Sequence, residues 1–267
     1  MPSTPGIELS KCLNLSQMNN ELMLQRHQPD GRSQRYVQAV WFARSLHSGT
    51  RWLPCDGAQG IVFVLKGEVS LDEHKLTAPF HIQPPSKHAV QLSYSADAEF
   101  AGIRLYPARL KALQQAVYPL LSEPGLCALA EQLGQAPTLC TLKKWLQTLS
   151  SAAPDPSYTM QHTYQLISSL MQLRPLEDAY RGVPLGIRQL ERQVKAQSEL
   201  TPKYLARIYR VRHAQQQLRD NPLIDLAQLA QLSGFSDQAH LTREFKHILK
   251  VTPGKYARQL SASVTIY

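Results

Sequence analysis

The stretch DLAQLAQLSGFSDQAHLTREFKHILKVTPGKY, residues 225–256, predicts two helices joined by a tight turn. Apolar residues recur at helical spacing in its first part, at Leu226, Leu229, Ala230 and Leu232. Gly234 suits the turn, and Ser236 is the expected N-cap of the second helix. Two helices joined by a turn that contains glycine are typical of a helix-turn-helix unit.

The second of these helices has two unlike faces. Its apolar side consists of Leu241, Phe245 and Ile248. At about 3.6 residues per turn, the opposite side carries small, polar and basic residues. These are Ala239, Thr242, Arg243 and Lys246. Such an outer face is expected of a recognition helix that lies in the major groove of DNA.

The positive charge of the chain is concentrated in its last third. The whole sequence of 267 residues has a formal net charge of +9. Residues 181–267 contain 14 lysines and arginines against 6 acidic residues, a balance of +8, whereas the first 180 residues balance at +1. A concentrated basic field favours binding of a polyanion through counterion release. The near-neutral remainder suggests a different task.

Length and composition predict a globular protein of two domains, with a boundary at residues 157/158. Hydrophobic residues make up 43% and charged residues 18% of the chain, which is typical of folded domains. No signal peptide and no long apolar run is recognisable, so we expect a cytoplasmic protein without a membrane partner. The cysteines are scattered, at Cys12, Cys55, Cys127 and Cys140. This spacing favours reduced thiols over disulfides or a zinc site.

The first domain shows a β pattern followed by a helical one. Alternating segments rich in valine and aromatic residues predict strands within residues 36–45, 60–71 (broken at Gly67), 88–95 and 99–106. A short helix is predicted around NNELMLQR, residues 19–26. Amphipathic runs predict helices at residues 108–121, 125–134, 141–150 and 163–182, with a linker at 151–157. The expected fold is therefore α+β, with a small cupin-like barrel or sandwich, following helices, and an all-α C-terminal domain.

A small β-barrel raises the question of a ligand or an active site. The residues that could line a cavity, if their strands face the interior, are Trp41, His47, Trp52 and Phe63. The histidines lack the spacing of a metal-binding barrel, and no nucleophile elbow, phosphate-binding loop or dinucleotide motif is present. We therefore expect no metal, no cofactor and no enzymatic activity.

An internal repeat organises the basic tail. LERQVK, which begins at Leu190, matches LTREFK, which begins at Leu241, with an offset of 51 residues, and both copies continue to a Thr-Pro pair. The first copy has its leading helix in PLEDAYRG and its turn in VPLG. Residues 202–219 between the copies predict one long helix. The repeat therefore predicts two helix-turn-helix units, and the exposed positions of the first are Arg188, Glu191, Arg192 and Lys195.

Residues 175–260 resemble the DNA-binding domain of the AraC/XylS family of bacterial transcription regulators, most clearly from Leu226 through GFSDQAHLTREFK to VTPGKY. The first half is similar to the sensor-type domain of a subgroup of these regulators through LPCDGAQGIVFVL and AGIRLYPARL. The resemblance implies a transcriptional regulator whose two units enter adjacent major grooves. It also departs from the family: Glu199 and Lys250 replace a usual glycine, and Gly186 stands where serine or threonine often caps the first recognition helix.

The resemblance also implies which side chains meet DNA. One groove would receive Arg188 and Arg192, and the next would receive Gln238, Thr242 and Arg243. Lys195 and Lys246 are placed as phosphate contacts. The expected partners are double-stranded promoter DNA, RNA polymerase if the regulator is an activator, a small-molecule effector and a second copy of the chain.

Three alternatives stay open at this point. The first half could act through a protein partner and bind no metabolite, which nothing in the sequence distinguishes. An enzyme with a DNA-binding tail would need catalytic or metal-binding residues that the sequence does not show. A DNA-repair relative with a methyl-accepting cysteine would need a reactive cysteine in a proline-rich motif, and neither Cys127 nor Cys140 has that setting.

Overall fold

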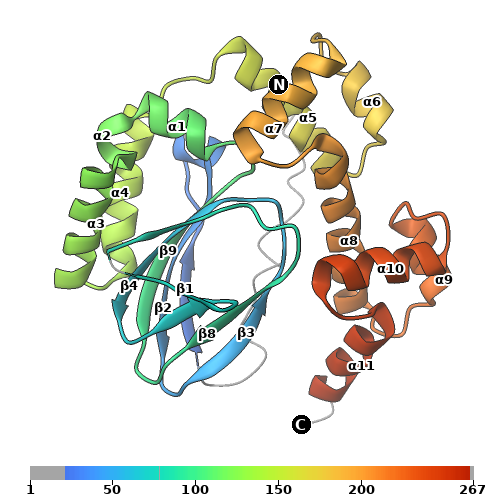
Figure 1. The fold of residues 1–267 in the computed structure, drawn as a ribbon, viewed down its shortest axis with the longest axis horizontal. Coiled ribbons are helices and arrows are strands. Elements are labelled where there is room, and N and C mark those ends of the chain that lie inside the picture. Colours follow the sequence, from blue (N-terminus) through green and yellow to red (C-terminus); the bar gives the residue numbers. More distant parts are fainter. Residues whose placement is uncertain (1–21, 78, 265–267) are drawn as a thin grey trace.

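The computed structural model describes residues 22–77 and 79–264, which form a β-rich part followed by helices (Figure 1). The strands are β1 (Leu22–His27), β2 (Val37–Ser45), β3 (Gly49–Leu53), β4 (Gly60–Lys66), β5 (Val69–Leu71), β6 (His74–Lys75), β7 (His81–Gln83), β8 (Val90–Tyr94) and β9 (Glu99–Leu105). A 3-10 turn, Ser33–Arg35, precedes β2. The predicted α+β class and the order of its two parts are confirmed.

The strands form two antiparallel sheets. One sheet has five strands in the order β1-β2-β9-β4-β7, and the other has four in the order β3-β8-β5-β6. Gly102 of β9 allows the tightest approach within the larger sheet, because a Cβ atom there would lie 2.4 Å from the Trp41 ring and 2.8 Å from the Ile61 carbonyl oxygen. A side chain at this position would therefore displace either the indole or a strand.

Alternation along β2 separates an inner face from an outer one. Ala39 and Trp41 point to the space between the sheets, whereas Val40 and Phe42 belong to the core beneath the following helices. Successive side chains of a strand point to opposite faces, so one apolar strand can supply both layers. The larger sheet is consequently covered on both sides.

The predicted strand segments correspond to β2, β4 with β5, β8 and β9. The predicted break at Gly67 falls between β4 and β5, where Gly67 has a φ of +75°. The short helix predicted at residues 19–26 is wrong, because residues from Leu22 onward form β1; residues 19–21 lie outside the described part. β1 pairs with β2 along its whole length, and this backbone pairing outweighs a local helical preference.

Helices α1 (Leu110–Ala116), α2 (Tyr118–Leu121), α3 (Glu123–Gln135) and α4 (Leu139–Ala152) cover the outer face of the larger sheet (Figure 1). Their core includes Leu113, Leu133 and Leu142, which are fully buried with Phe63 of β4. The run predicted at residues 108–121 divides into α1 and α2. Burial of the apolar stripe of each helix against the sheet explains this layer.

The remaining helices are α5 (Tyr158–Met171), α6 (Leu176–Arg181), α7 (Ile187–Ser198), α8 (Pro202–Asp220), α9 (Leu226–Leu232), α10 (Gln238–Leu249) and α11 (Pro253–Val264). They share one core, which contains Leu166 of α5 together with buried residues of α7, α8 and α10. The helical run predicted at residues 163–182 is interrupted at residues 172–175. Leu173 there has a positive φ of +63°, and Pro175 precedes α6.

Glu199 and Lys250, which stand where the resemblance leads us to expect glycine, end their helices in the same backbone conformation. Glu199 ends α7 with a φ of +62°, and Lys250 ends α10 with a φ of +61°. Both residues therefore adopt the left-handed conformation that glycine adopts at a helix C-terminus without steric cost. The repeat is preserved in the backbone although the favoured residue is absent.

Replacing Glu199 with glycine should raise the free energy of unfolding by about 1 kcal/mol, because it removes the strain of a side chain in the left-handed region. The exposed Lys111–Glu199 ion pair, 3.4 Å long, contributes little against this gain. Urea unfolding followed by circular dichroism measures the change. As a control, Ala196→Gly inside α7 should lower stability by about 1 kcal/mol. A loss of stability in Glu199→Gly would contradict the explanation.

Candidate nucleic-acid interface and ligand cavity

The second helix-turn-helix unit consists of α9, a turn at Gly234 and α10. The Asp225 side chain caps α9 by accepting hydrogen bonds of 2.9 Å from the amides of Ala227 and Gln228. Gly234 has a φ of +72°, which glycine adopts freely. The predicted N-cap of α10 is wrong by one residue: the cap is Asp237, whose carboxylate accepts the His240 amide at 2.7 Å.

The shift of the cap has a local reason. Ser236 donates its hydroxyl to the Asp237 carboxylate at 2.9 Å, so it supports the cap instead of forming it. These hydrogen bonds, led by the one from the His240 amide, lower the pKa of Asp237. The carboxylate is therefore charged at the positive end of the α10 dipole, where a negative charge is stabilising.

The α10 helix presents the face that the sequence predicts. Leu241, Phe245 and Ile248 are fully buried, and they fix the helix on the domain core. The opposite positions predicted to meet DNA are exposed at Gln238, Ala239, Arg243 and Lys246, and half-buried at Thr242. Arg243, Lys246, His247 and Lys250 border one shallow depression on this helix. The arrangement offers donors to an acidic surface.

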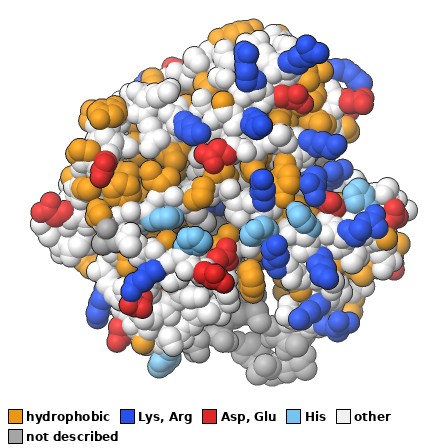
Figure 2. Space-filling view, viewed as in Figure 1, with side chains coloured by type: hydrophobic (Ala, Val, Ile, Leu, Met, Phe, Trp, Pro, Cys, Tyr) orange, Lys and Arg blue, Asp and Glu red, His pale blue; other side chains and the backbone are white. Residues whose placement is uncertain are grey.

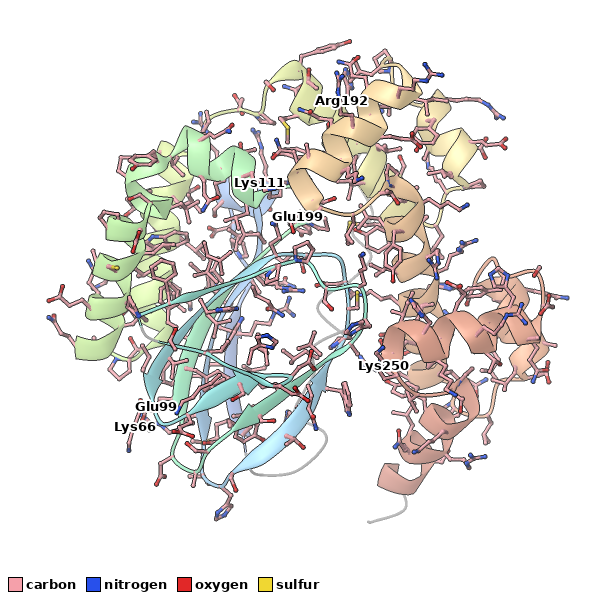
Figure 3. All side chains as sticks on the ribbon, viewed as in Figure 1. Lys66, Glu99, Lys111, Arg192, Glu199 and Lys250 are labelled. Carbon is pink, nitrogen blue, oxygen red and sulfur yellow. The ribbon has the colours of Figure 1, made fainter. Side chains whose placement is uncertain are left out.

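The first unit consists of α6, a turn at residues 182–186 and α7. Gly186 occupies the N-cap position and provides no side-chain cap. Leu190 and Val194 are buried, while the predicted contact residues Arg188, Glu191, Arg192 and Lys195 are all exposed. Arg192 points away from the body of the protein in Figure 3. Glu191 accepts the Tyr180 hydroxyl at 3.1 Å, which ties α7 to α6.

Helix α8 connects the two units and braces the second one. Arg207 donates two hydrogen bonds to Glu244 of α10, of 2.7 and 3.1 Å. Arg210 donates to the Gly234 carbonyl at 3.3 Å. The sequence predicted the long helix that carries both arginines but gave no signal for their pairing with Glu244, which is 37 residues from Arg207. A bidentate pair of this kind fixes the angle between two helices.

Basic side chains gather over the C-terminal helices. In Figure 2 the lysines and arginines of the visible face lie mostly on the half that holds α6 to α11, while apolar side chains gather over the N-terminal helices. The charge asymmetry of the sequence is thus an asymmetry of the surface. A surface with this concentration of cations attracts a polyanion and holds it in a salt-dependent manner.

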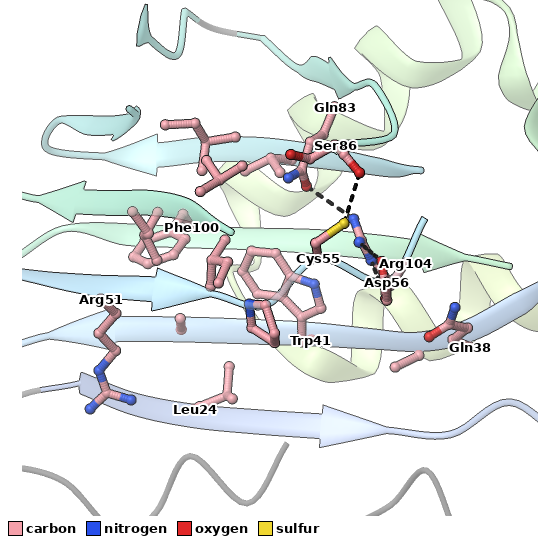
Figure 4. A pocket seen from close by; sticks show the side chains of 18 of the residues that line it. Leu24, Gln38, Trp41, Arg51, Cys55, Asp56, Gln83, Ser86, Phe100 and Arg104 are labelled. Carbon is pink, nitrogen blue, oxygen red and sulfur yellow. Dashed lines mark hydrogen bonds and ion pairs between the residues drawn. The ribbon is translucent and has the colours of Figure 1, made fainter. Parts of the chain in front are cut away.

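A cavity of about 140 Å³ lies between the two sheets (Figure 4). Its walls are mostly apolar, with Leu24, Trp41, Val62, Leu92 and Phe100 from five different strands. Trp41 meets Phe100 edge to face, with ring centroids 5.7 Å apart. An apolar cavity with a small polar region is typical of a small-molecule site.

The four residues predicted to line a cavity lie in different places. Trp41 lines the cavity. Phe63 is fully buried on the other face of β4, under the helices, because it follows the inward Val62 by one residue. Trp52 is 55% exposed for the same reason, between the lining residues Arg51 and Leu53. His47 is exposed in the turn after β2.

The polar end of the cavity contains a buried aspartate between two arginines, which the sequence did not single out. The Asp56 carboxylate forms ion pairs with Arg104 of β9 and, at 3.5 Å, with Arg212 of α8. Their side chains are 12%, 19% and 17% exposed in that order. Burial opposes the charge of Asp56, but the two arginines together hold its pKa below the usual range. The carboxylate is therefore ionised at neutral pH.

Within residues 22–77 and 79–264, no three His, Cys, Asp or Glu side chains are grouped so that they could hold a metal ion. Across the same ranges, no helix has the length and hydropathy needed to cross a membrane.

Residues 181–259 match a family of domains described as helix-turn-helix. A comparison with curated protein sequences finds no match. Among solved structures, ToxT from Vibrio cholerae is similar at 10% identity, covering 91% of this chain and 100% of that chain with a TM-score of 0.43. ToxT bound to (E)-4-(8-methylnaphthalen-1-yl)but-3-enoic acid is similar at 11% identity, with coverage of 90% and 100% and a TM-score of 0.44.

The AraC-like transcriptional activator CuxR is similar at 11% identity, with coverage of 88% and 90% and a TM-score of 0.28. The matched residues 181–259 span α7 to α10 and both copies of the repeat in the sequence. The chain therefore carries a helix-turn-helix domain over residues 181–259.

Proposed function

We propose that the protein is a sequence-specific transcriptional regulator that reads two adjacent major grooves of promoter DNA. The observation that carries the proposal is the pair of exposed recognition helices: α7 has Arg188 and Arg192 on its outer face, and α10 has Arg243. Helix α8 connects the two units, and its Arg207 and Arg210 hold the second unit through hydrogen bonds to Glu244 and to the Gly234 carbonyl. RNA polymerase is the expected further partner if the regulator is an activator.

The chemistry of recognition requires no covalent step. Arg188, Arg192 and Arg243 can each bond bidentately to guanine, Gln238 can bond to adenine, and Thr242 can meet a thymine methyl. Lys195 and Lys246, a turn further along their helices, suit phosphates. Glu191 and Ala239 complete the two outer faces, where Glu191 can accept from a cytosine amino group.

The DNA site should be longer than one helix-turn-helix unit can cover. Two units on one face of a duplex contact successive major grooves about 34 Å apart, one helical turn. Selection of bound fragments from random DNA, followed by footprinting, should therefore give a site with two separated conserved elements. A single element no longer than one unit can cover would contradict the tandem arrangement.

The N-terminal domain is proposed to sense a small molecule in the cavity between the sheets. Its mostly apolar walls and the charged group of Asp56, Arg104 and Arg212 at one end support a ligand with an apolar body and a polar group. A regulator controlled by a protein partner is the second candidate, and dimerisation of the chain through this domain is compatible with either. The apolar side chains that gather over α1 to α4 in Figure 2 support the second candidate, because an exposed apolar patch is typical of a protein-protein contact.

Filling the cavity should separate these two candidates. Ala43 is fully buried and lines the cavity, so Ala43→Phe should occupy the space that a ligand would take. In a thermal-shift screen of metabolites, a cavity ligand at about 100 times its Kd should stabilise the wild type by about 2.7 kcal/mol and leave the variant unchanged. Compounds that stabilise both proteins equally bind elsewhere. A screen in which stabilisation requires an added protein would favour the second candidate.

A further inference from the structure

The wall of the cavity is shared between the two domains at one point. Among the described residues that line it, Arg212 is the only one from residues 158–267. It reaches Asp56, which also pairs with Arg104, so one carboxylate joins a strand of the sandwich to the long helix α8. Anything that enters the polar end of the cavity therefore meets a side chain of the DNA-binding domain.

The same wall is attached to the recognition helix α10. Ser86 and His88 line the cavity, and the Cys55 thiol donates to the Ser86 carbonyl at 2.8 Å. Next in the chain, the Ala89 amide donates to the carbonyl of Ile248 in the last turn of α10, at 2.6 Å. The last carbonyls of a helix have no partner within the helix. Ala89 therefore caps α10 from the other domain.

Two further contacts hold this junction in place. The Tyr204 hydroxyl of α8 donates to the Lys87 carbonyl at 3.0 Å and lies 3.3 Å from His247 of α10. Gly57, beside Asp56, packs so closely on α8 that a Cβ atom there would lie 2.5 Å from Leu205. Lys250, which ends α10, lies at the end of the helix nearest the sandwich (Figure 3).

Two residues of α10 that are predicted to meet DNA take no part in these contacts. Arg243 and Lys246 are exposed, whereas the junction touches Ile248 and His247. The N-terminal domain therefore leaves these two side chains accessible. The contact with the N-terminal domain makes α10 more ordered. An ordered helix loses less conformational entropy when it binds DNA.

We propose that Arg212 is a positioning residue through which the contents of the cavity set the order of α10 and thereby the affinity for DNA. While Asp56 and Arg212 are paired, residues 86–89 keep their contact with the end of α10. A ligand group that accepts hydrogen bonds at the polar end of the cavity competes with Asp56 for Arg212 and weakens this contact. The link to DNA rests on the proposed function, whereas the contact between the domains does not.

Arg212→Met tests the junction without a ligand. The variant keeps the Asp56–Arg104 pair, so the sandwich retains a balanced buried charge. Hydrogen exchange of the full chain should show faster exchange of the Ala89 and Lys250 amides, by about tenfold, with amides in the middle of α8 unchanged. Lys203→Met, on an exposed position of the same helix, removes the same charge and should leave both amides unchanged.

DNA affinity supplies the second readout. Against the selected site, Arg212→Met should bind about threefold or more weakly than Lys203→Met, although the Arg212 side chain is only 17% exposed and Lys203 is on the surface. Arg212→Lys keeps a cation beside Asp56 and should restore both readouts in part.

Unchanged exchange in Arg212→Met would overturn the proposal. If Arg212→Met showed faster exchange but bound DNA as tightly as Lys203→Met, the link between the junction and DNA binding would be refuted. A wild-type protein that binds no DNA would refute the proposed function instead, and the exchange measurement would still decide whether Arg212 seats residues 86–89 on α10.

Discussion

Replacing Arg243 with alanine should weaken binding to the selected DNA site by about 5- to 150-fold, which corresponds to about 1–3 kcal/mol for a good base contact. Arg243 is exposed on the outer face of α10, so its removal leaves the core of the domain intact. Circular dichroism should show an unchanged helix content, and a gel-shift titration at fixed salt measures the affinity. The loss should be larger for the selected site than for random DNA.

Arg258 of α11 provides the matched control. It is exposed in the same domain but lies outside both recognition helices, so Arg258→Ala removes the same charge without a predicted base contact. Its effect should be confined to a small, sequence-independent loss. If both variants lost affinity equally, Arg243 would be a source of general charge and not a reader of bases.

Replacing Phe245 with alanine should lower the free energy of unfolding by about 3–5 kcal/mol, because it leaves a cavity in the core of the DNA-binding domain. The Phe245 side chain is fully buried and packs against the Tyr256 ring, with centroids 5.8 Å apart. Urea unfolding measures the loss. Most of a small domain's stability would disappear, so DNA binding should fail at a temperature where the wild type still binds.

Leu232→Ala separates this burial from a general effect of apolar truncation. Leu232 lies at the end of α9 and is 52% exposed, so Leu232→Ala should lower the free energy of unfolding by much less than Phe245→Ala does. The decrease for Phe245→Leu should lie between these two. A Phe245→Ala protein of wild-type stability would mean that α10 is not anchored through its apolar face.

Local patterns and the repeat were sufficient to predict the DNA-binding domain. Leu241, Phe245 and Ile248 are buried where a period of 3.6 residues places them. The offset of 51 residues also identified the unit that comes first in the chain, although its turn lacks a typical N-cap residue. The cap at Asp237 was missed by one residue, because serine and aspartate are both good caps and only the backbone decides between them.

The residues that line the cavity were harder to predict, because they depend on which of the two alternating faces of each strand points inward. Trp41 and Phe63 are both aromatic residues in strands, yet one faces the opposite sheet and the other faces the helices. A shift of one residue exchanges the two faces of a strand, and sequence alternation does not say which face is inner when helices cover the outer face with equally apolar contacts. The strand β1 was missed because its hydrogen-bond partner is another segment of chain.

By itself, the sequence determined the helix-turn-helix units, the basic character of the last third and the order of the two domains, because these follow from periodicity, charge and repetition within short windows. Only the tertiary structure decided that Asp56 meets Arg212 and that Ala89 caps α10. Those contacts join residues about 160 positions apart, between side chains and backbone groups that carry no local pattern, so their partners exist only once the two cores have packed against each other.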